Sequence, residues 1–182
     1  VPATPSTFIP NGASAIISGL SKRMKITVIA VGKIKEKYFE EAVKEYSKRL
    51  SRYCRLEIIQ VPDEKTPDGA GAALEQQIKE KEGQRILEKI PTDAYVIALA
   101  IEGKMLDSLS LSQKLEELGI RGTSHIAFII GGSLGLSSQV LSRADFKLSF
   151  SPMTFPHQLM RVVLLEQIYR SYRIIHHEPY HK

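Results

Sequence analysis

The stretch HIAFIIGGSLGLS, residues 125–137, decides the fold that the sequence predicts. Its first half is an uninterrupted apolar run, which is typical of a strand buried on both faces of a parallel sheet. Three glycines follow at Gly131, Gly132 and Gly135, and glycine lets a backbone turn sharply and approach a ligand closely. Ser137 then stands where a helix N-cap is expected. The stretch therefore predicts a buried strand that runs through a glycine turn into a helix.

The same alternation of strand and helix extends over the rest of the chain. Short β-branched and apolar runs predict further strands at 25–32, 56–61 and 95–101, and a weaker one at 146–151. Apolar periodicity, caps and prolines predict helices at 36–52, 73–90, 109–118, 137–143 and 156–174. The charge-dense helix over 73–90 is expected to face solvent. We therefore predict an α/β fold with a mainly parallel sheet, helices on both faces and right-handed crossovers.

Length and composition favour a single domain over residues 24–182. The chain has 182 residues, of which 43% are hydrophobic and 25% charged, the balance of a soluble globular protein. Residues 1–23 contain three prolines and no acidic residue, so we interpret them as a leader, either an extension left from expression or the remnant of a transit peptide. No apolar run approaches the roughly 20 residues of a membrane span, so we expect no membrane association and a cytoplasmic location. The net charge of +5 fits a polyanionic partner without requiring one.

The glycine turn belongs either to a ligand site or to a simple tight turn. It is not a P-loop, because no Gly-Lys-Ser/Thr follows, and no acidic residue on a later strand marks it as a dinucleotide site. Two other strand ends, 98–104 and 149–155, offer small and apolar side chains and backbone groups. Ligands of open α/β sheets bind beyond the carboxyl ends of the strands. These three segments can therefore enclose an adenosine, and their lack of a charge cluster favours S-adenosylmethionine over ATP.

Several motifs together resemble the RlmH family of SPOUT-class methyltransferases over residues 24–182. They are VGKIKEKY, KEGQRIL, IEGK, FIIGGSLGL, LSFSPMTFPHQLMRVVLLEQIYR and a terminal PYHK. The resemblance implies methyl transfer from S-adenosylmethionine to the position-three ring nitrogen of a pseudouridine in a 23S ribosomal RNA stem-loop, on the large subunit or the assembled ribosome. It also implies a trefoil-knotted fold and a homodimer. The apolar run VVLLEQIY fits a dimer interface, but a core helix under the sheet explains it nearly as well.

The resemblance also implies which residues hold the cofactor. Carried over by position, they are Leu99, Gly131, Phe150, Ser151, Pro152, Met153, Thr154 and Phe155. Pro152 departs from the expected pattern, since proline has no backbone N–H to donate.

The candidate catalytic residues lie in the last 26 residues of the chain. His157 begins the last predicted helix, where we expect the helix dipole to keep the imidazole neutral and hydrogen-bonding, with a simple helix-start side chain as the alternative. Arg161 lies one turn on and suits a phosphate or a base, with an ion pair as the alternative. Glu166 is expected to be a structural partner of an arginine. Tyr180 and His181 lie on a tail that is ordinarily disordered, but the resemblance implies that the tail covers the cofactor of the other subunit.

In that arrangement Tyr180 can stack on a base, His181 can take the proton and Lys182 can touch phosphate. No ligand cluster predicts a metal site, because the adjacent His176 and His177 point apart. A basic surface, interleaved with glutamates, is formed by Lys33, Lys35, Lys37, Lys48, Arg49, Arg52 and Arg55. Two rival readings remain open at this point, a nucleotide-binding regulatory module without catalysis and a methyltransferase acting on proteins or small molecules.

Overall fold

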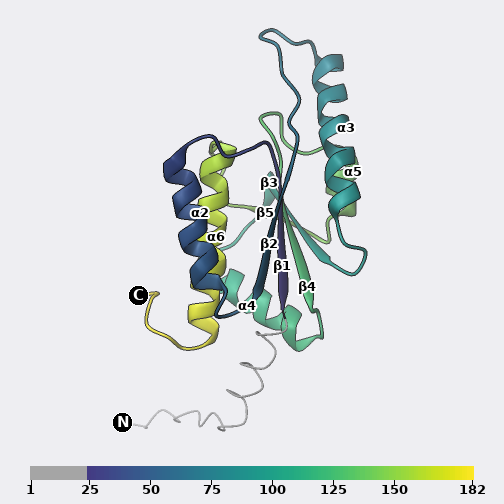
Figure 1. Ribbon diagram of the computed structural model, residues 1–182. Helices are drawn as coiled ribbons and strands as arrows, with labels where there is room; N and C mark the ends of the chain where they lie inside the picture. Colours follow the sequence, from purple (N-terminus) through teal and green to yellow (C-terminus); the bar gives the residue numbers. More distant parts are fainter. Residues whose placement is uncertain (1–23) are drawn as a thin grey trace, which may run out of the picture.

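The computed structural model describes residues 24–182, and the predicted leader, residues 1–23, lies outside them (Figure 1). Five strands alternate with five helices in the described part of the chain. In order they are β1 (Lys25–Val31), α2 (Lys37–Leu50), β2 (Arg55–Val61), α3 (Ala72–Lys89), β3 (Tyr95–Met105), α4 (Ser108–Ile120), β4 (His125–Ile130), α5 (Ser138–Arg143), β5 (Phe146–Ser149) and α6 (His157–Ile175). Each predicted strand and helix is confirmed, with ends that differ by a few residues.

The strands form one sheet in the order β2-β1-β4-β3-β5, and every neighbouring pair is parallel. The predicted parallel sheet is therefore confirmed. β4 lies at the centre and is buried at all six residues, as its uninterrupted apolar run requires. β2 lies at an edge, and its residues are exposed or partly covered except for Val61, which is buried.

Helices cover both faces of the sheet, as predicted. Figure 1 shows α2 and α6 side by side on one face and α3 and α5 on the other. The larger apolar core includes Leu50 of α2, Leu115 of α4 and Leu164 of α6, packed against β1, β3 and β4. The smaller core joins Ile86 of α3 and Val140 of α5 to the opposite face. Leu164 and Leu165 are fully buried, so packing against the sheet accounts for this part of the VVLLEQIY run.

The expectation that the helix over 73–90 faces solvent holds for most of α3 but misses one buried face. α3 buries Ile78, Glu82, Gly83 and Ile86 against the sheet and α5. Gly83 allows this close approach, because a Cβ there would lie 2.2 Å from Ser137 Oγ. Dense surface charge on the rest of the helix hid a narrow buried face.

β3 extends four residues past its predicted end at 101, because it contains an irregularity that the sequence does not reveal. Leu99 and Lys104 both pair with Leu148 of β5, so the residues between them bulge out of the ladder. Gly103 lies in this excursion, and a Cβ there would come within 2.7 Å of the Lys147 carbonyl group. The contact requires glycine and holds the end of β3 against β5.

Candidate active site

Two of the three predicted cofactor segments follow strands: Gly131 follows β4 and the segment 150–155 follows β5. The stretch 98–104, expected to be a strand end, lies instead within β3. β4, β3 and β5 are adjacent and parallel, so Leu99, Gly131 and the segment 150–155 come from the carboxyl-end region of one half of the sheet. Leu99 is partly buried and packs against the larger core. The structure therefore brings the three segments to the place where open α/β sheets bind ligands.

The glycine turn is tight and leaves no room for a side chain at Gly131. A Cβ there would lie 2.9 Å from the carbonyl carbon of Gly135. Gly135 has a φ of +84°, and its N–H donates to the Gly132 oxygen at 3.1 Å. Ser137 then caps α5, since its hydroxyl accepts from the Val140 N–H at 3.3 Å. The predicted turn and N-cap are confirmed.

The segment 150–155 presents apolar side chains around a small hydrogen-bonded turn. Phe150 packs partly into the core, while Met153 is 72% and Phe155 39% exposed. The Ser151 hydroxyl accepts from the Met153 N–H at 3.0 Å, and the Ser151 carbonyl accepts from the Ser149 hydroxyl at 3.3 Å. The turn thus stabilises itself without an N–H from Pro152. Exposed apolar side chains after a parallel strand suit a ligand with a planar ring.

His157 and Arg161 lie together at the carboxyl end of β1. A Cβ on Gly32 would be 3.4 Å from His157 Nε2, so the imidazole lies against this glycine. Burial lowers the pKa of His157, and the nearby Arg161 lowers it further, so the ring is neutral at neutral pH. The predicted neutral imidazole is therefore supported, with burial as its main cause.

Arg161 is only 1% exposed, so in this structure it is not open to a phosphate or a base, contrary to the expectation. Its Nη2 donates to the carbonyl oxygens of Val31 at 2.8 Å and Gly32 at 2.7 Å. Nε and Nη1 are buried, and they make no hydrogen bond within residues 24–182. Burial lowers the pKa of the guanidinium. In this place Arg161 holds the end of β1 beneath His157.

We expect Arg161→Met to lower the free energy of unfolding by about 1 to 3 kcal/mol, because it leaves two buried carbonyl oxygens without their donor. Urea denaturation followed by circular dichroism measures the change. Arg161→Lys is the matched variant; it keeps the charge but reaches one carbonyl at most, so its loss is expected to be smaller. An unchanged midpoint for the methionine variant would contradict a structural role for Arg161.

Glu82 is a residue of this region that the sequence did not reveal. It is 4% exposed on α3, and its Oε1 accepts from the Glu64 N–H at 3.0 Å. Its Oε2 lies 2.8 Å from the position that a Cβ on Gly132 would take, and is unpartnered in the described part of the chain. Burial raises the pKa of this carboxyl. Glu82 thus packs against the glycine turn at Gly132. In the sequence it stands in the charged stretch KEKEGQR, which looks like helix surface.

The carboxyl-terminal tail turns back along α6. Tyr180 packs edge-on against Tyr169, with 5.0 Å between ring centroids, and lies under the Arg170 guanidinium at 4.6 Å. Its hydroxyl donates to Glu166 Oε1 at 3.2 Å, and burial together with this carboxylate raises the pKa of Tyr180 to about 12. His181 Nδ1 lies 3.4 Å from Arg170 Nη1. The structure therefore groups Tyr180 and His181 with Arg170, which the sequence presented only as one more positive charge.

The prediction that Glu166 pairs with an arginine is confirmed. Arg170 Nη2 lies 2.6 Å from Glu166 Oε1, and both side chains are largely covered. Glu166 Oε1 therefore joins Arg170 to the tail, since the same oxygen accepts from the Tyr180 hydroxyl.

Within one chain the tail is held against the middle and later part of α6, whereas His157 begins this helix. At about 1.5 Å of rise per residue, Arg170 lies about 20 Å along α6 from His157, and Glu166, which Tyr180 contacts, lies about 14 Å from it. Figure 1 shows the carboxyl terminus beside the far end of α6. The candidate catalytic residues of one chain are therefore spread along α6.

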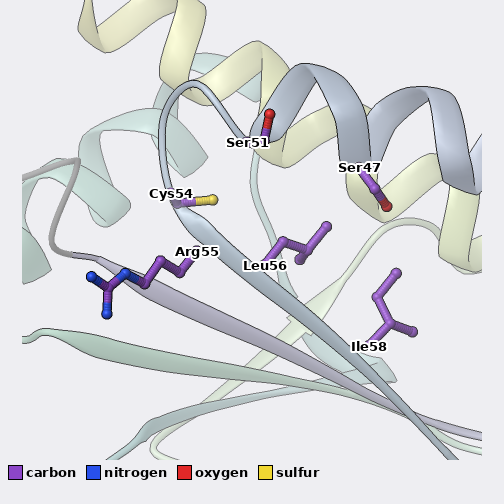
Figure 2. Close-up of a pocket in the computed structure, with 6 residues that line it drawn as sticks. All are labelled: Ser47, Ser51, Cys54, Arg55, Leu56 and Ile58. Atoms are coloured by element: carbon purple, nitrogen blue, oxygen red, sulfur yellow. The ribbon is translucent and has the colours of Figure 1, made fainter.

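A separate cavity of about 590 Å³ lies between the end of α2 and the start of β2. Figure 2 shows Leu56 and Ile58 projecting from β2 toward α2, with Arg55 pointing to the other side. The cavity is lined by Ser47, Ser51, Cys54, Arg55, Leu56 and Ile58. It adjoins the beginning of an edge strand and is not part of the site at the carboxyl ends of β3, β4 and β5.

Over 24–182 no group of three or more His, Cys, Asp or Glu side chains is arranged to hold a metal ion. In the same part of the chain, no helix combines the length and hydropathy of a membrane span.

Comparison with known proteins identifies the family. The family model described as "Predicted SPOUT methyltransferase" matches residues 24–181. The chain is 65% identical over 159 residues to "Ribosomal RNA large subunit methyltransferase H" of Bifidobacterium adolescentis, a match that covers 87% of this chain and 100% of that protein. A protein of the same name from Clostridium kluyveri is 63% identical over 159 residues, with coverage of 87% and 100%.

A solved structure shares the fold at low sequence identity. It is described as "a probable methylase family protein from Haemophilus influenzae Rd KW20" and matches with a TM-score of 0.50 and 11% identity, over 88% of this chain and 71% of that one. At this identity the likeness concerns the fold alone. The family match across residues 24–181, together with the two full-length relatives, shows that the chain belongs to the RlmH family of SPOUT methyltransferases.

Proposed function

We propose that the protein transfers a methyl group from S-adenosylmethionine to the position-three ring nitrogen of a pseudouridine in a 23S ribosomal RNA stem-loop. The observation that carries the proposal is the match to ribosomal RNA large subunit methyltransferases H along their whole length. The ribosomal substrate places the reaction in the cytoplasm. A chain of 182 residues offers few surfaces for RNA, so we propose that it needs the preformed surface of a large subunit or an assembled ribosome.

The residues of the three predicted cofactor segments fit the methyl donor. Backbone at Gly131 can approach an adenosine because no side chain fits there, and Leu99, Phe150, Met153 and Phe155 offer apolar walls. Ser151 and Thr154 add hydroxyl groups, and Pro152 stiffens the turn between them. When bound, S-adenosylmethionine supplies an activated methyl group on a positively charged sulfur.

Catalysis then depends mainly on positioning, with proton removal as a smaller contribution. The target nitrogen must lose a proton before or during transfer, and we assign this proton to the imidazole of His181. Tyr180 stays neutral because of its raised pKa and can stack on the base. Neutral His157 can donate or accept a hydrogen bond beside the cofactor segment, and Arg161 positions it from below. Lys182 can contact phosphate.

We propose a homodimer in which each tail completes the site of the other subunit. The tail contacts Glu166 and Arg170, which lie about 14 Å and 20 Å along α6 from His157 of the same chain, and this separation supports the arrangement. Exposed apolar side chains near the cofactor segments also support it, since Ile101, Met105 and Leu109 are 54%, 60% and 48% exposed. The trefoil knot implied by the family remains a prediction.

We expect the purified protein to transfer a radiolabelled methyl group from S-adenosylmethionine into 23S RNA of ribosomes from a strain that lacks this enzyme. Digestion of the RNA and chromatography of the nucleosides should show a single product, 3-methylpseudouridine. Ribosomes from a strain with the enzyme serve as the control and should accept no label. Label in another nucleoside, or in protein, would contradict the proposed substrate, and efficient labelling of a naked stem-loop would contradict the need for a ribosomal surface.

A further inference from the structure

The tail begins with a tight reversal of the chain at the end of α6. The His177 N–H donates to the Ile174 oxygen and the Glu178 N–H to the Arg173 oxygen, both at 2.9 Å. His177 has a φ of +54°, the left-handed conformation that this type of helix end requires. The reversal directs Glu178 back toward the preceding turn of the helix.

The Glu178 carboxylate is held by side chains from two distant parts of the chain. Arg173 Nη1 of α6 lies 2.6 Å from its Oε2, and the Tyr53 hydroxyl donates to the same oxygen. Arg52 Nη2 reaches Oε1 at 3.2 Å. Burial by itself raises the pKa of Glu178, but Tyr53, Arg173 and Arg52 together outweigh it, so the pKa is lowered and the group is charged at neutral pH.

These partners are themselves fixed. Tyr53 is 3% exposed and stacks on Tyr172, with 5.6 Å between ring centroids and 8° between ring planes. Arg173 also donates through Nη2 to the Pro179 oxygen at 2.9 Å and through Nη1 to the Tyr53 hydroxyl at 3.3 Å. The carboxylate and the next backbone carbonyl are thus attached to one buried aromatic stack.

We propose that Glu178 is a positioning residue for methyl transfer, because its attachment to Arg173 and Tyr53 fixes the part of the tail from which Tyr180 and His181 extend. The inference rests on the proposed function, which assigns those two side chains to the reaction. His181 follows Glu178 by only three residues, so if the Glu178 contacts are lost, the position of the His181 imidazole is no longer fixed. A misplacement of about 1 Å at a reacting group can reduce the rate by up to roughly a hundredfold.

The test compares Glu178→Ala with Glu178→Gln and Tyr53→Phe in ribosome methylation. We expect Glu178→Ala to lower kcat about tenfold, with KM for ribosomes and Kd for S-adenosylmethionine changed less than about twofold, because only the alignment of the tail is lost. Glu178→Gln keeps the length and an acceptor oxygen, so it should retain about a third of wild-type kcat. Tyr53→Phe keeps the ring stack and removes the hydroxyl, and we expect about a threefold loss.

A second measurement reports on the tail without using activity. Carboxypeptidase B should release Lys182 at least about tenfold faster from Glu178→Ala than from wild type, because the tail is then free to enter the protease. Glu117→Ala is the control; it removes an exposed carboxylate from the pair with Arg121 and should change neither rate. An unchanged kcat in Glu178→Ala overturns the proposal, whatever the release rate. If wild type methylates no ribosome, the proposed function fails, and equal release from both proteins then overturns the attachment itself.

Discussion

Removal of Tyr180, His181 and Lys182 is expected to lower methyl transfer into ribosomes by about a hundredfold to ten-thousandfold, the range that a positioned proton acceptor contributes. The three residues carry the proposed stacking ring, base and phosphate contact, and they make no contribution to the sheet or its cores. The fold should therefore survive, with an unchanged unfolding midpoint. Single-turnover assays on ribosomes measure the rate, and calorimetry should find Kd for S-adenosylmethionine changed by less than about tenfold.

One substitution and one single-residue deletion separate the contributions within the tail. His181→Ala should cause most of the loss in kcat, whereas deletion of Lys182 alone should mainly raise KM for the ribosome. A truncated protein that kept more than a tenth of wild-type activity would contradict a catalytic tail. The outcome also tests whether the tail is held in place as the structure shows, with Tyr180 hydrogen-bonded to Glu166 and His181 near Arg170.

A mixture of two impaired variants, assayed at a concentration of S-adenosylmethionine too low to fill the Gly131→Val site, tests whether the tail acts on the other subunit. One chain lacks residues 180–182, and the other carries Gly131→Val in the cofactor turn. In a dimer with crossed sites, a mixed pair contains one intact site, and random mixing should restore about a quarter of wild-type activity. If the tail acted within its own chain, neither chain of the mixed pair would hold an intact site, and no activity would return.

The fold was largely predictable because its signals are local. The apolar run of β4 required burial on both faces, and the glycine turn with the Ser137 cap marked the start of α5. Contacts between distant segments carried no such signal. The buried face of α3 depends on contacts with Ser137 and with the glycine turn, which lie about 50 residues later in the chain. The extension of β3 depends on pairing with the backbone of β5.

The candidate site divides in the same way. Gly131 and the segment 150–155 follow β4 and β5, so the general rule for parallel sheets predicted their place. Leu99 lies within β3, because this strand runs on to Met105. The place of Arg161 could not be predicted, since its partners Val31 and Gly32 precede it by 130 and 129 residues. Glu178 likewise meets Tyr53 across 125 residues. Charged residues at such positions look like surface charges until the packing of the helices is known.

Gly131→Val is expected to weaken binding of S-adenosylmethionine by about tenfold to a hundredfold, because overpacking a tight site costs about 1 to 3 kcal/mol. A Cβ at this position would lie 2.9 Å from the carbonyl carbon and 3.0 Å from the oxygen of Gly135, and 3.0 Å from Leu136 Cδ2. Two of these three atoms are backbone atoms, which cannot move aside as a flexible side chain can. The turn must open, and its backbone then moves away from the proposed adenosine. Titration calorimetry measures the affinity.

Gly119→Ala is the matched control, since it adds a methyl group to a glycine on the same scaffold. Gly119 lies within α4, and its Cβ would meet only the Met24 Cε at 3.7 Å, an ordinary contact. Alanine is favoured over glycine inside a helix, so this variant should be stabilised by up to about 1 kcal/mol and should bind S-adenosylmethionine as wild type does. A Gly131→Val protein that is folded and binds the cofactor with wild-type affinity would place the adenosine elsewhere. The proposed cofactor site would then be wrong, because in that proposal the adenosine binds against the closed glycine turn.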